Sequence, residues 1–66
     1  MYRTDLINAV MGEKRLTNES LASAAKVSAP TISAIRNGKW DGKLSVLKSV
    51  AEALGLRLSD LIKEAA

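Results

Sequence analysis

The stretch Asn18–Asn37, NESLASAAKVSAPTISAIRN, carries the clearest structural signal in this 66-residue chain. Its apolar positions do not fit one straight helix, but they fit two short helical faces folded onto one another. Ala22 is small enough to let a second helix backbone approach, and Val27 faces inward in the turn. Ile32 and Ile35 are three residues apart, on one face of the second helix. The stretch predicts two short helices that share one core.

Local residues predict the ends of these two helices. Thr17 or Asn18 caps the first helix, which ends near Ala25. Ser28 is a good N-cap for the second helix, and Pro30 lies in its first turn, where a missing N–H is tolerated. That helix spans about 29–37, and Gly38 can take the left-handed conformation beyond its end.

Similar patterns predict three more helices. The first runs from Thr4 or Asp5 to Lys14, the fourth spans about 43–54 and stops at Gly55, and the fifth follows a Ser59 cap over about 60–64. The segment 38–42 contains two glycines and reads as a loop. We expect a frayed terminus at Tyr2 and Arg3, with a short arm that contacts a binding partner as the lesser alternative. The fourth helix should bury a stripe of apolar residues: Leu44, Leu47, Val50, Ala51 and Leu54.

Composition narrows the classes of function. The chain is the size of a single small domain, residues 1–66, and it has no cysteine and no histidine. We therefore expect no metal, no cofactor and no catalytic constellation, which makes an enzyme the weakest reading. The longest uncharged stretch, residues 27–35, is too short to span a membrane. These features indicate a cytoplasmic protein.

The net charge of +3 is unevenly distributed along the chain. Residues 1–43 carry seven Lys and Arg against four Asp and Glu, whereas residues 44–66 carry three of each. Basic residues surround the second helix of the pair, as expected of a surface that meets phosphates. Ordinary solvated lysines would give the same net charge, so the argument depends on where these residues lie.

The paired helices resemble the helix-turn-helix of lambdoid phage repressors and Cro proteins. The resemblance extends to Glu13–Asn18 before the pair, and to Leu54-Gly55-Leu56 and Ser59-Asp60-Leu61 after it. It implies an all-α, compact, five-helix lambda-repressor-like DNA-binding domain. Helices two and three then form the helix-turn-helix.

The resemblance also implies how DNA would be bound. The third helix would lie in the major groove of double-stranded DNA, and the second would cross the backbone. Base edges would be met by Ser28, Ala29, Pro30, Thr31, Ser33 and Ala34. Phosphates would be met by Asn18, Lys26, Arg36, Asn37, Gly38, Lys39 and Lys43.

Two residues depart from the family pattern. Ala29 stands where members often carry glutamine, so the third helix has few long side chains to read bases, and DNA shape gains importance. Lys26 stands at a turn position that favours glycine because the backbone there is left-handed. A lysine there costs about 1–2 kcal/mol.

Related proteins dimerise through the loop after helix three and through helix five. The resemblance therefore makes Trp40, Leu56 and Leu58 candidates for a homodimer interface, one that forms in solution or only on DNA. Core or semi-buried packing is the default role for Trp40, and the dimer interface and a contact on the phosphate side are its alternatives.

The leading hypothesis is a Cro-like phage or prophage repressor that binds a pseudo-palindromic operator and needs no small-molecule ligand. A protein-interaction module of the same fold, such as an antitoxin or an anti-repressor, is the alternative, and the short side chains of the third helix favour it. An activator or a restriction-modification controller also remains open.

Overall fold

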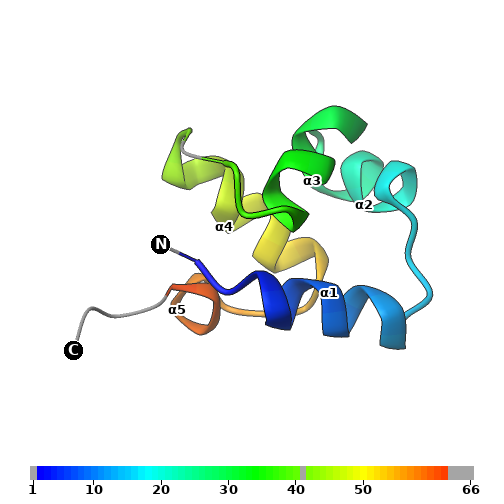
Figure 1. Ribbon diagram of the computed structural model, residues 1–66, viewed down its shortest axis with the longest axis horizontal. Helices are drawn as coiled ribbons and strands as arrows, with labels where there is room; N and C mark the ends of the chain where they lie inside the picture. Colours follow the sequence, from blue (N-terminus) through cyan, green and yellow to red (C-terminus); the bar gives the residue numbers. More distant parts are fainter. Residues whose placement is uncertain (1, 41, 63–66) are drawn as a thin grey trace.

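The computed structural model describes residues 2–40 and 42–62, and in them it contains five helices (Figure 1). The expected all-α fold is confirmed, and the helices lie close to their predicted ranges. In chain order they are α1 (Thr4–Glu13), α2 (Asn18–Ala25), α3 (Ala29–Arg36), α4 (Leu44–Ala53) and α5 (Leu58–Leu61).

Side-chain caps and left-handed residues define the α2–α3 pair. The Thr17 side chain accepts a hydrogen bond from the Ser20 N–H at 3.0 Å, and Ser28 accepts one from the Thr31 N–H at 3.3 Å. Lys26 ends α2 with a φ of 60°, and the next residue, Val27, donates its N–H to the Ala22 carbonyl at 2.9 Å. This backbone reversal folds α3 back onto α2.

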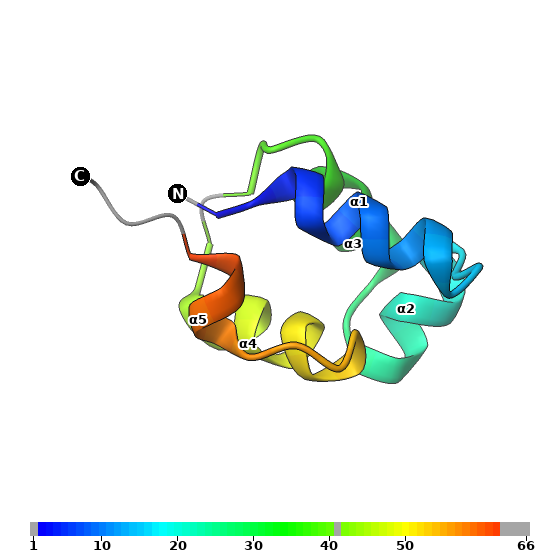
Figure 2. The same cartoon turned by 90° about the horizontal axis from the view of Figure 1, so that it is seen from below.

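The helices enclose a single apolar core. α2 packs against α3 and α4, α1 packs against α3 and α5, and α5 also packs against α4. Figure 2 shows α2 and α5 at opposite ends of the molecule, with α4 between them. Each helix contributes buried residues to this core: Ile7 and Met11, Leu21, Ala22 and Ala25, Ile32 and Ile35, Leu47, Val50 and Ala51, and Leu61.

The prediction that Leu44 is a core residue was wrong, because 56% of this residue is exposed. Leu44 is the first residue of α4, whereas α2 approaches the C-terminal half of that helix, around Ser49 and Ala53. Helical spacing places Leu44 on the same stripe as Leu47, but no helix among the described residues covers this end of the stripe. The other predicted members of the stripe are buried.

The expected fraying at the N-terminus was also wrong. Tyr2 is buried and forms an isolated antiparallel bridge with Ile62, and the Arg3 N–H donates to the Leu61 carbonyl at 2.7 Å. The Tyr2 hydroxyl donates to the Ile35 carbonyl at 2.8 Å and accepts from the Trp40 N–H at 3.2 Å. Residue 2 therefore joins the start of the chain to the end of α3.

The last helix begins at Leu58, two residues earlier than the Ser59 cap predicted. Arg57 is its N-cap, and the Arg57 N–H donates to the Asp60 carboxylate at 3.0 Å, so Ser59 lies inside the helix. The helix ends at Leu61 and Ile62 is extended, so the prediction of a helix through residue 62 was wrong, while the predicted residues 63 and 64 lie outside the described residues. In the part of the chain that the structure describes, every helix is too short or too polar to cross a membrane.

Candidate nucleic-acid interface

The outward side of α3 is built from small side chains. Ile32 and Ile35 are fully buried and anchor the helix to the core. The predicted base-facing residues lie on the remaining surface: Ser28 and Pro30 are exposed, and Ala29, Thr31, Ser33 and Ala34 are half-buried. The Ser28 and Thr31 hydroxyls are 2.8 Å apart and share one hydrogen bond. This surface can approach another molecule closely, because nothing long projects from it.

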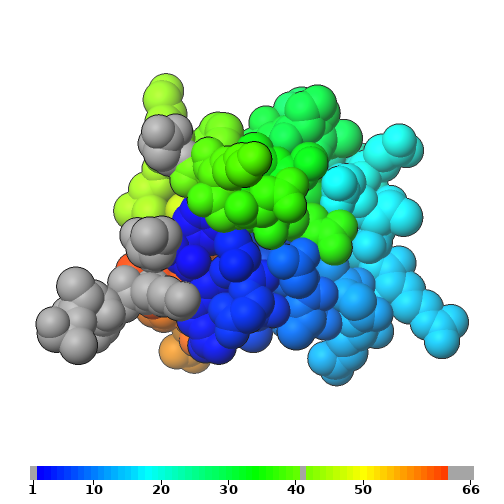
Figure 3. Space-filling view, in the orientation of Figure 1, coloured from blue at the N-terminus to red at the C-terminus, as the bar shows by residue number. Residues whose placement is uncertain are grey.

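Three of the predicted phosphate-contacting residues come together beside α3. Asn18, Arg36 and Asn37 line one hollow of about 270 Å³, which also includes the base-facing Ser33. In Figure 3, α1, α2 and α3 adjoin on the face shown. The same hollow contains Asn8 of α1, which sequence reasoning missed because an asparagine inside a helix belongs to no motif.

The predicted lysines do not share this hollow. Lys26 lines a separate depression with Ser49 and Glu52, and Lys39 lies beside Trp40. Lys43 is the N-cap of α4. All three lysines are exposed, so they surround the α2–α3 pair as separate charges rather than as one cluster.

The backbone at the end of α3 is already hydrogen bonded. The N–H groups of Asn37, Gly38 and Lys39 donate to the Ser33, Ile35 and Ala34 carbonyls at 3.0–3.1 Å. Gly38 has a φ of 73°, as predicted for the residue that closes this helix. Any phosphate contact here therefore falls to side chains, chiefly Asn37 and Lys39.

No Asp or Glu is among the described residues that line the hollow. Within residues 2–40 and 42–62, the one ion pair joins Arg3 to Asp5 at 3.0 Å, at the start of α1. The hydrogen bond from the Arg3 guanidinium holds the pKa of the Asp5 carboxyl below its usual value. Arg36 therefore has no carboxylate partner among the described residues.

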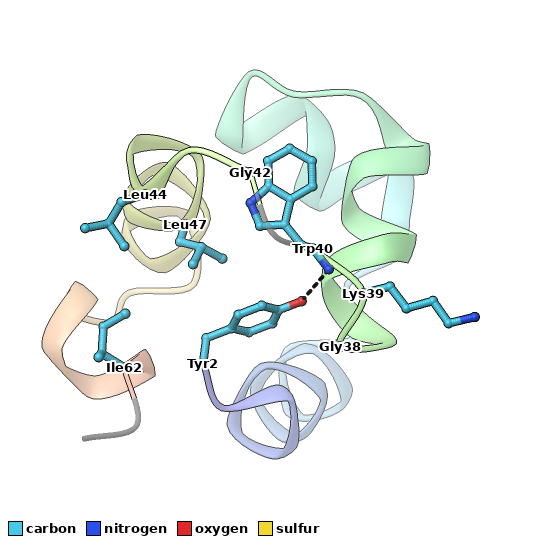
Figure 4. A pocket seen from close by; sticks show the side chains of 8 residues that line it. All are labelled: Tyr2, Gly38, Lys39, Trp40, Gly42, Leu44, Leu47 and Ile62. Atoms are coloured by element: carbon cyan, nitrogen blue, oxygen red, sulfur yellow. Dashed lines mark hydrogen bonds between the residues drawn. The ribbon is translucent and has the colours of Figure 1, made fainter. Parts of the chain in front are cut away.

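A second surface feature is an apolar cleft of about 440 Å³ between the N-terminal segment, the α3–α4 loop and α4 (Figure 4). Trp40, Leu44 and Leu47 line it together with Tyr2 and Ile62. The Trp40 Nε1 atom is buried and has no hydrogen-bond partner within the described residues. The other two candidate interface residues, Leu56 and Leu58, are half-buried and pack against the core.

Known proteins resemble this chain in both sequence and structure. It is 34% identical over 58 residues to the immunity repressor protein of Bacillus phage phi105, a match that covers 88% of this chain and 40% of the repressor. The crystal structure of the clp gene regulator ClgR from Corynebacterium glutamicum superposes with a TM-score of 0.75 at 28% identity, over 86% of this chain and 61% of ClgR. The chain thus spans less than two thirds of either protein.

By their names both relatives are regulators, which points away from an enzyme. The Cro/C1-type HTH DNA-binding domain matches residues 7–64, which include all of α2 and α3 and the hollow beside them. With this match over most of its length, the chain belongs to the Cro/C1-type HTH DNA-binding domain family.

Proposed function

We propose that this chain binds operator DNA as a homodimer and acts as a transcriptional repressor of the Cro kind. The observation that carries this proposal is the α2–α3 pair, in which α3 presents a surface of short side chains bordered by Arg36, which has no carboxylate partner among the described residues. The family membership and the phage repressor relative support the same assignment. Bound repressor would act by blocking access of polymerase to the promoter.

In this proposal α3 enters the major groove with Ala29, Pro30, Ser33 and Ala34 toward the bases. The two alanines and the proline offer apolar contact to thymine methyl groups, and Ser33 offers one hydrogen bond. Such contacts discriminate less than a bidentate pair, which contributes about 1–3 kcal/mol. DNA shape and half-site spacing would therefore supply much of the specificity.

Phosphate contacts would position the domain on the duplex. Asn18 is the first residue of α2, where the helix dipole favours an anion, and Arg36 donates to its side chain from the end of α3; Asn37 borders the same hollow. Lys26, Lys39 and Lys43 are exposed around the pair and would meet phosphates farther along the backbone. These contacts would be independent of base sequence.

For the homodimer we propose the cleft around Trp40 as the interface. Leu44 is the one large hydrophobic residue exposed in the described part of the chain, and it lines this cleft beside Trp40. A second copy would cover Leu44 and the rest of the apolar lining of this cleft. Leu56 and Leu58 would contribute only at the margin, because they already pack against the core.

The first experiment is selection of bound duplexes from a random library with the purified chain, followed by sequencing of the enriched pool. We expect an inverted repeat whose half-site centres are about one helical turn apart. If no sequence is enriched and binding stays weak even at low salt, the repressor proposal fails. The antitoxin or anti-repressor alternative, which the short side chains of α3 favour, would then be the better one.

A further inference from the structure

The hollow beside α3 holds a positively charged group in an unusual setting. Arg36 donates from Nε to the Asn8 Oδ1 atom at 2.6 Å, and from Nη1 to the Asn18 Oδ1 atom at 2.7 Å. The Asn8 Nδ2 atom donates in turn to the Arg36 carbonyl at 3.3 Å. Two amide oxygens, from α1 and α2, thus hold a guanidinium that belongs to α3.

This arrangement fixes the guanidinium without neutralising it. Amide oxygens accept hydrogen bonds but carry no net charge, and the one ion pair among the described residues lies elsewhere. A guanidinium has five N–H donors, and the two contacts leave about three of them available. The half-buried Arg36 therefore keeps its charge and its donors for a further, anionic group.

The position of the hollow indicates which anion would bind. Ser33, on the side of α3 proposed to face the bases, lines the same hollow as Arg36. A duplex lying against α3 would bring its phosphates to the edge of that surface. An arginine suits a phosphate because its planar fork matches two phosphate oxygens.

We propose that Asn8 is a positioning residue, which holds the Arg36 guanidinium in place to bind a DNA backbone phosphate. The inference rests on the proposed DNA binding and adds an α1 residue to that interface. Asn8 itself touches no phosphate; it acts through Arg36. It also fixes the guanidinium before DNA arrives, which reduces the conformational entropy lost on binding.

The discriminating variant is Asn8→Asp. The carboxylate keeps an acceptor beside the Arg36 Nε atom and adds an ion pair, but it loses the amide N–H that donates to the Arg36 carbonyl, so the protein should melt close to the wild-type temperature. The same carboxylate neutralises the guanidinium and repels a phosphate. We expect affinity for a mixed-sequence duplex at low salt to fall about tenfold, and the slope of log K against log salt to become shallower by about 0.9 per lost phosphate contact.

Two further variants complete the test. Arg36→Gln removes the guanidinium and should flatten the salt slope by the same amount. Arg57→Gln removes one charge at the N-cap of α5, the helix at the opposite end of the molecule from α2 in Figure 2, and should leave the slope unchanged. All three variants lower the net charge by one, so net charge alone cannot separate them.

A different outcome would overturn the proposal. If Asn8→Asp and Arg36→Gln both bind DNA with the slope of Arg57→Gln, the guanidinium that Asn8 holds meets no phosphate. If the wild-type chain itself bound no duplex at low salt, the DNA-binding proposal would fail instead. Measuring the wild type first distinguishes these two failures.

Discussion

In the α3–α4 loop, the Trp40 ring packs so closely against Gly42 that residue 42 has no room for a side chain. A Cβ atom built on Gly42 would stand less than 3.0 Å from three ring atoms of Trp40, whereas one on Gly12 would meet nothing within 4 Å. We expect Gly42→Ala to displace the indole and lower the free energy of unfolding by about 1–3 kcal/mol. Gly12→Ala, inside α1, should raise it by about 0.5–1 kcal/mol. Urea unfolding, with the fluorescence of the single tryptophan as readout, compares the two variants.

Tyr2 shows what a residue-level reading of the sequence misses. Its hydroxyl contacts Ile35 and Trp40, more than thirty positions along the chain, and no local pattern announces such partners. Tyr2→Phe removes the hydroxyl and leaves a buried carbonyl without its donor, so we expect about 1–2 kcal/mol less stability. A frayed terminus would give no change in the urea midpoint, which makes this measurement decisive.

At the scale of the helices, Lys26 sets backbone strain against surface charge. Its φ of 60° is left-handed, so Lys26→Gly should raise the free energy of unfolding by about 1 kcal/mol. The same variant removes a charge proposed to meet phosphate and should weaken DNA binding. Lys26→Gln separates the two effects, because it removes the charge but keeps the strain. Equal DNA affinity in wild type and both variants would exclude Lys26 from the interface.

The helices were the most predictable part of this protein, because their signals are local. Ser28 and Thr17 cap α3 and α2, and Gly38 and Gly55 are left-handed at the helix ends, as their types suggested. The error at Ser59 has the same origin. Serine is a common N-cap, but here the Asp60 carboxylate accepts the Arg57 N–H, which makes Arg57 the N-cap.

At the scale of the whole molecule, the sequence pattern does not reveal which helices pack against which residues. Helical spacing assigns Leu44 to the same apolar stripe as Leu47, yet only the packing of α2 and α5 against α4 decides which end of the stripe is covered. Asn8 likewise gains its partners from α2 and α3, which spacing along α1 cannot reveal. The helix-turn-helix motif predicted the residues that α2 and α3 contribute to the hollow, whereas the contribution of Asn8 from α1 became visible only in the folded structure.

Assembly provides the last prediction, at the scale of two molecules. Leu44 is largely exposed, so Leu44→Lys should change the stability of one chain little, but it would place a charge in the cleft proposed to join two copies. Ser45→Lys puts the same charge on the exposed neighbouring residue and serves as the control. We expect only Leu44→Lys to sediment as a monomer and to lose about tenfold or more in affinity for an inverted repeat. Both variants should bind a single half-site equally well, because a residue of the dimer interface contacts the second copy and not the DNA. If both variants sediment alike and bind the inverted repeat equally well, the two copies meet through another surface.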